Sequence, residues 1–126
     1  MKGSNMSKNV LLVGKNHKCL RGKDRVVLTP EQNNTLMIYA FAVAKHTELD
    51  QKFVLNEMYE AIRIFCEHHM LPCFASYDNV DTATKLQIIK DIAEIMFNRL
   101  QPFVNEKVLD YALVQALYMI TTYMIN

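Results

Sequence analysis

The sequence predicts a mainly α-helical protein, a four-helix bundle-like domain with a short N-terminal β-hairpin or ribbon. A chain of 126 residues is typical of one domain. Three Gly and three Pro are too few for a loop-rich or all-β fold. From residue 30 onward, apolar residues recur at helical spacing, in segments separated by proline or helix-capping residues. We expect residues 1–8 to be flexible and residues 9–126 to form a single domain, with the ribbon at 9–28 and the four helices at 30–126.

The ribbon is predicted by two short aliphatic runs, Asn9–Val13 and Arg25–Leu28. The polar stretch between them has Gly14 near its start and Gly22 near its end, which is typical of a turn between two strands. An isolated hairpin is only marginally stable in water. The ribbon is therefore expected to pack on the helices or on a partner.

The first helix is expected to run from Pro30 to about His46. Thr29 is a suitable N-cap, Pro30 suits the first helical position, and Gln32 completes a capping box. Residues 36–44 are nine consecutive apolar residues. A helix that is apolar on every side belongs in the middle of a core.

The second and third helices are expected over residues 50–69 and from Asp81 or Thr82 to about Leu100. Leu71 and Pro72 end the second helix, and residues 73–79 form a loop. Each helix carries one apolar stripe: Val54, Met58, Ala61, Ile62, Phe65 and His69 on the second, and Ile89, Ile92, Ala93, Met96 and Leu100 on the third.

The fourth helix, expected from Phe103 to the C-terminus, has two apolar faces. One comprises Leu109, Leu113, Ala116, Leu117, Ile120 and Met124, and the other Val104, Val108, Tyr111, Tyr118 and Thr122. A helix in a monomeric bundle needs only one apolar face, so this helix is expected either to be central or to associate with a second copy. The residues expected in a homo-oligomer interface are Leu113, Leu117, Tyr118, Ile120 and Met124.

Charge divides the chain into two parts. Residues 1–25 carry seven Lys or Arg and one acid, a net charge of +6, whereas the other 101 residues have a net charge of −5. A basic segment of this kind binds polyanions or acidic partners. It contains no aromatic residue, which argues against base stacking and leaves a nucleic-acid backbone, an acidic protein surface, or acids of the same protein such as Glu57, Glu60 and Glu67. The residues expected to contact the partner are Lys15, Lys18, Arg21, Lys23 and Arg25.

Cysteine and histidine cluster in two places, at residues 17–19 and at residues 66–73. Cys66 and His69 are three residues apart on the second helix, and Cys73 follows Pro72. Together with His17 or Cys19 they could complete a tetrahedral zinc site. The alternative is that these cysteines behave as small core residues. We expect no metal or cofactor, and a structural zinc ion is the second hypothesis.

Catalysis is not expected, because the chain contains no H-E-x-x-H or G-x-S-x-G motif and no phosphate-binding loop of the right spacing. The odd number of Cys and the polar Met1–Asn9 stretch favour a cytoplasmic protein. The longest charge-free stretch, Tyr111–Ile125, is shorter than the ~20 residues that a membrane-spanning helix needs.

The sequence thus favours a non-enzymatic interaction or regulatory module that forms a homodimer and offers its basic ribbon to an acidic protein or a nucleic-acid backbone. Two alternatives stay open. One is a zinc-stabilised domain or small metal-dependent enzyme, and the other is a virion or scaffold assembly subunit. The composition, rich in Asn, Lys and Ile, also fits a small phage or mobile-element protein.

Overall fold

The computed structural model describes residues 11–12 and 26–125, and in this part of the chain four α-helices pack together. The predicted mainly α-helical class is confirmed. The predicted flexible residues 1–8 and most of the ribbon lie outside the described residues. In chain order the elements are β1 (Leu11–Leu12), β2 (Val27–Leu28), α2 (Pro30–Thr47), α3 (Gln51–His68), η1 (Phe74–Tyr77), α4 (Thr82–Leu100), η2 (Gln101–Phe103) and α5 (Glu106–Ile125).

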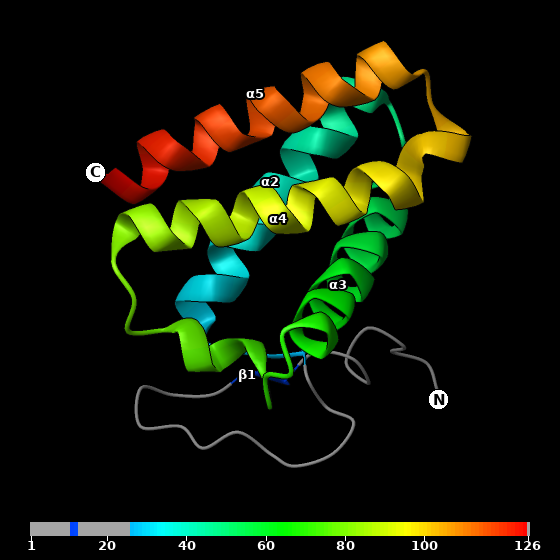
Figure 1. The fold of residues 1–126 in the computed structure, drawn as a ribbon. Coiled ribbons are helices and arrows are strands. Elements are labelled where there is room, and N and C mark those ends of the chain that lie inside the picture. The colour runs from blue at the N-terminus through cyan, green and yellow to red at the C-terminus, as the bar shows by residue number, and fades with distance from the viewer. Residues whose placement is uncertain (1–10, 13–25, 126) are drawn as a thin grey trace.

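The helices are arranged as two antiparallel pairs that cross each other (Figure 1). The turn at η2 reverses the chain between α4 and α5, which run side by side. Helices α2 and α3 form the second pair and cross behind α4 in this view. Helix α2 packs against both α3 and α5, and α4 also packs against both. The four helices therefore close around one core.

The capping residues read from the sequence begin the helices where expected. Thr29 Oγ1 accepts from the Gln32 amide at 3.1 Å, and Gln32 Oε1 accepts from the Thr29 amide at 3.0 Å, which completes the capping box. Asp50 caps α3 and Asp81 caps α4 through their side chains. Each cap satisfies amide groups that have no partner within the helix, so the start of each helix is fixed locally.

The last helix begins later than predicted. Residues 101–103 form the short 3₁₀ helix η2, and α5 starts at Glu106 rather than at Phe103. Asn105 Oδ1 accepts hydrogen bonds from the amides of Lys107 at 2.9 Å and Val108 at 3.3 Å. Asn105 is therefore the side chain that starts α5, because it supplies the acceptor that the first-turn amides require.

The core is centred on α2, as its uninterrupted apolar sequence predicts. Tyr39, Ala40 and Val43 are fully buried, Met37 and Ile38 are half-buried, and Phe41 is 36% exposed. The stripes predicted for α3 and α4 are also buried, except that Ala93 is half-buried and His69 is exposed. His69 lies at the C-cap of α3, beyond the last turn that the core covers.

The two strands pair, but not as the hairpin that the sequence predicts. β1 and β2 run parallel, with Leu11 opposite Val27 and Leu12 opposite Leu28. A hairpin joins antiparallel strands, whereas parallel strands need a connection of about a dozen residues or more. The segment 13–26 is long enough for such a connection. β2 is fully buried and adjoins η1 and α2, so the strand pair is attached to the helical body.

Helix α3 ends in a Schellman motif that places Met70 in the left-handed region, at φ 56°. The Leu71 amide donates to the Cys66 carbonyl at 2.8 Å and the Met70 amide to the Glu67 carbonyl at 3.2 Å. Glycine usually occupies this position because a Cβ atom is disfavoured there. The Met70 side chain is 86% exposed, so it contributes little packing in return.

Replacing Met70 by glycine is therefore expected to raise the free energy of unfolding by about 0.5–1 kcal/mol. A residue with a Cβ atom is strained at positive φ, and glycine removes that strain. Urea unfolding followed by circular dichroism measures the change. Met70→Ala is the matched control, because alanine keeps the Cβ atom and should bring no gain. Equal stabilisation by both substitutions would contradict the explanation that the Cβ atom of Met70 destabilises the left-handed conformation.

Candidate functional site

The basic segment cannot be placed from the structure. Its five predicted contact residues, Lys15, Lys18, Arg21, Lys23 and Arg25, lie outside the described residues. Its attachment point can be placed, because β2 follows the segment directly and is buried beside η1 and α2. The basic segment therefore joins the body at the end that carries η1 and the start of α2 (Figure 1).

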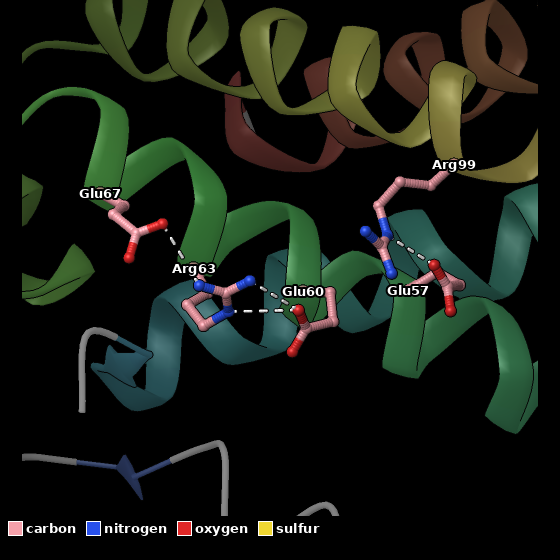
Figure 2. Close-up of polar contacts among 5 residues, drawn as sticks. All are labelled: Glu57, Glu60, Arg63, Glu67 and Arg99. Atoms are coloured by element: carbon pink, nitrogen blue, oxygen red, sulfur yellow. Dashed lines mark hydrogen bonds and ion pairs between the residues drawn. The ribbon is translucent and has the colours of Figure 1, made fainter. Parts of the chain in front are cut away.

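The acidic residues considered as an internal docking site for that segment already have partners (Figure 2). The Arg99 guanidinium on α4 contacts the Glu57 carboxylate on α3 at 2.6 Å. Arg63 contacts Glu60 at 3.0 Å and Glu67 at 3.4 Å. The hydrogen bond with Glu60 is the largest cause of the raised pKa of Arg63. Because two arginines oppose these three carboxylates, the cluster has a net charge of only −1 to offer to the basic segment.

The proposed metal ligands are spread over different environments. Cys66 on α3 and Cys73 before η1 are both fully buried, whereas His69 is exposed and its ring lies 4.4 Å from that of Phe65. His17 and Cys19 lie outside the described residues. Within residues 26–125, no group of three or more His, Cys, Asp or Glu side chains is placed to hold a metal ion. Cys73 is disulfide-bonded, so its sulfur is not available as a thiolate ligand, and the prediction that Cys73 binds zinc is wrong.

Helix α5 has the two apolar faces that its sequence predicts, and the structure distinguishes them. Leu109, Ala116 and Ile120 are fully buried, and Leu113 is 7% exposed. This face closes the core against α2, where the Tyr39 hydroxyl donates to the Leu113 carbonyl at 3.5 Å. The prediction that Leu113 and Ile120 lie in an oligomer interface is therefore wrong, because the protein's own core covers them.

The other face of α5 points outward and is unusually apolar for a surface. We call it the α5 outer face and define it as Val108, Tyr111, Val114, Tyr118 and Met119, with exposures between 41% and 75%. Of the predicted interface residues, Tyr118 belongs to this face, Leu117 is half-buried beside it, and the side chain of Met124 lies outside the described part. Of the two alternatives predicted for α5, a central position does not hold, because its outer face is exposed.

Sequence reasoning missed Val114 and Met119. Val114 lies one turn from Tyr111 and Tyr118, so helical spacing alone places it beside them. A groove of about 450 Å³ between α4 and α5 adjoins this face and is lined in part by Val114 and Leu117. Beyond Asp110, α5 contains no charged residue at all. From Tyr111 onward the α5 outer face therefore carries no charged residue, whereas the adjoining groove is also lined by Lys90, Asp91, Glu94 and Asp110.

No protein-family model, curated protein or solved structure matches this chain. Among the described helices, none is both long enough and apolar enough to cross a membrane. The α5 outer face therefore has to be interpreted from its own chemistry.

Proposed function

We propose that the protein is a non-enzymatic interaction module that forms a homodimer through the α5 outer face and uses its basic segment to bind an acidic protein surface. The observation that carries the proposal is the exposure of Tyr118, at 75%, in a helix without charge beyond Asp110. Contiguous apolar surface of this kind marks interaction sites in soluble proteins.

The chemistry of the α5 outer face supports a second copy as its partner. Tyrosine and methionine are enriched in protein interfaces, and tyrosine is a frequent energetic hot spot. In a two-fold interface residue i of one copy contacts residue j of the other and residue j contacts residue i, so one patch must be complementary to itself. Tyr111, Val114 and Tyr118 carry no charge, so these residues can pair with one another without charge repulsion.

The charge distribution supports an acidic protein rather than a nucleic acid as the second partner. The basic segment carries the positive charge, whereas residues 26–126 have a net charge of −5. A long polyanion that extends past the segment would meet a negatively charged body, but a compact acidic patch on a protein would not. The lack of aromatic residues in the segment also removes the stacking that single-stranded nucleic acids use.

Sedimentation equilibrium tests the dimer directly. The expected mass is about twice the 14.6 kDa of the chain. A protein that stays at 14.6 kDa up to high concentration would contradict the dimer. Growth into larger assemblies would also contradict it and would favour the scaffold subunit.

Neutralising the basic segment is expected to abolish binding to an acidic probe. Lys15, Lys18, Arg21, Lys23 and Arg25 would all be changed to glutamine, and binding to a fluorescent polyglutamate peptide measured by anisotropy. A 20-base-pair DNA duplex is the comparison probe. Loss of the electrostatic contacts should remove most of the binding to polyglutamate, which the wild-type protein should prefer over the duplex.

The matched control changes five lysines of the body to glutamine and so removes the same charge: Lys45, Lys52, Lys85, Lys90 and Lys107. This variant should keep its affinity for polyglutamate. If the duplex is preferred, raising the salt from 50 to 200 mM should weaken its binding about 500-fold for five phosphate contacts. A preference for the duplex with this salt dependence would contradict the acidic protein partner and would indicate that the segment binds a nucleic-acid backbone.

A further inference from the structure

A cavity of about 480 Å³ lies at the end of the bundle where four segments meet. Its walls come from the N-terminal halves of α2 and α4, from η1 with the residue after it, and from the end of α5. These segments lie on the left side of the view in Figure 1. The volume falls within the ~300–1,000 Å³ that small-molecule sites occupy in proteins. None of the residues that define the α5 outer face lines the cavity.

The floor of the cavity is apolar and fixed by the core. Leu36, Phe74, Ile88 and Ile89 line it, and each is at most 6% exposed. The Phe74 carbonyl accepts a hydrogen bond from Gln32 Nε2 at 3.3 Å, which links η1 to α2 across the cavity wall. A floor made of core side chains cannot rearrange without disturbing the packing, so the cavity is preformed.

One wall of the cavity is aromatic. Phe74 and Tyr77 meet edge to face with ring centroids 6.1 Å apart, and Tyr123 lines the cavity from α5. Burial raises the pKa of Tyr77, so its hydroxyl stays neutral at physiological pH. Aromatic rings accept apolar bodies by stacking, and their faces attract cations.

The charged side chains at the cavity are two acids and one base. Glu31, Asp78 and Lys85 all line it. Among the described residues, none of the three takes part in an ion pair. The described rim residues therefore have a net charge of −1, and neither carboxylate is held in an ion pair among the described residues.

From this combination we infer that the cavity binds a small organic cation with an aromatic body, of the arylalkylamine class. The apolar floor and aromatic wall would receive the ring, and the carboxylates of Glu31 and Asp78 would receive the ammonium group. An organic anion of the same shape would meet two like charges and one opposite charge. Charge thus selects the cation, and shape selects the ring.

The test uses three probes of nearly the same shape: 2-phenylethylamine, phenylalanine and 3-phenylpropionate, which are a cation, a zwitterion and an anion. Two-dimensional amide NMR on the full chain follows Thr35, Tyr77 and Lys85, all of which line the cavity. The amine should shift these signals saturably, with a Kd on the order of 1 mM for a ligand of this size. The zwitterion should bind more weakly and the anion not measurably.

Three variants separate charge from shape. Glu31→Gln with Asp78→Asn should weaken amine binding at least tenfold, and Lys85→Gln should strengthen it. Thr35→Phe should abolish binding by filling the cavity. The matched control is Glu48→Gln with Glu106→Gln, which removes two exposed acids outside the cavity and should leave the amine affinity within twofold of wild type.

Thermal unfolding monitored by circular dichroism confirms that each variant is folded before its affinity is compared. Three results would overturn the inference: no saturable shift with the amine, equal or tighter binding of 3-phenylpropionate, or undiminished amine binding by the Glu31→Gln, Asp78→Asn protein. The first result would show that the cavity does not bind the amine, and the other two would show that charge does not determine which ligand binds. None of them depends on whether the protein is a dimer.

Discussion

Replacing Tyr39 by alanine is expected to lower the free energy of unfolding by about 4 kcal/mol, because it removes a large aromatic side chain from a fully packed site. Tyr39 is fully buried on α2, the helix that packs against both α3 and α5. Its hydroxyl also reaches the Leu113 carbonyl on α5. Urea unfolding monitored by circular dichroism measures the loss.

Phe41 is the matched control for this substitution, since it is aromatic, lies on the same helix and is two residues away. It is 36% exposed, so Phe41→Ala should cost about 2 kcal/mol, roughly half the loss expected at Tyr39. Similar losses at both positions would mean that α2 is not central to the core. The comparison therefore tests the arrangement of the helices as well as the size of the effect.

Tyr39→Phe separates the hydroxyl from the ring and should cost only about 0.5–1 kcal/mol near neutral pH. Burial raises the pKa of Tyr39 well above its ordinary value of 10.0. Above pH 10 the unfolded chain therefore releases this proton while the folded protein keeps it. Wild-type stability should fall by about 1.4 kcal/mol per pH unit from this group alone, and Tyr39→Phe should not share that loss. Unfolding at pH 9 and pH 11 makes the comparison.

The helix boundaries could be predicted because their signals are local. Thr29 with Gln32 and the carboxylates of Asp50 and Asp81 each satisfy amides within three residues along the chain. Asn105 carries the same kind of signal, and recognising it would have placed the start of α5 correctly. No packing information is needed for such contacts.

The strand direction and the covered face of α5 could not be predicted in the same way, because both depend on contacts between distant segments. The sequence around β1 and β2 permits either direction, and their pairing is settled by how β2 is buried beside η1. Both faces of α5 are apolar, so hydrophobicity alone could not choose between them. The small residues of α5 indicate which face is covered. Ala112 and Ala116 are fully buried, because small side chains allow a neighbouring helix to approach closely.

The cavity at the end of the bundle left no signal in the sequence. Its lining comes from four segments, and Leu36 is separated from Tyr123 by most of the helical domain. Individually, residues such as Ile88 and Lys85 match the ordinary pattern of core and surface positions on a helix. Only the fold brings the apolar floor, the aromatic wall and the carboxylates of Glu31 and Asp78 to one place.

Replacing Tyr118 by glutamate is expected to convert the dimer to a monomer, with a rise in the dimer dissociation constant on the order of 1,000-fold. In a two-fold interface the substitution removes a tyrosine from both copies and puts a carboxylate into an apolar contact twice. Loss of a hot-spot tyrosine costs about 2 kcal/mol for each copy. Sedimentation equilibrium over a range of protein concentrations measures the dissociation constant.

The fold itself should tolerate this change, because Tyr118 is 75% exposed and supports little of the core. Asn56→Glu is the matched control: it adds the same charge at an exposed position on α3, away from the α5 outer face, and should leave the dimer intact. Tyr111→Glu should act like Tyr118→Glu, because both residues lie on the same face. Equal weakening by Asn56→Glu would assign the effect to net charge, whereas dimers that persist in both tyrosine variants would place the interface elsewhere on the molecule.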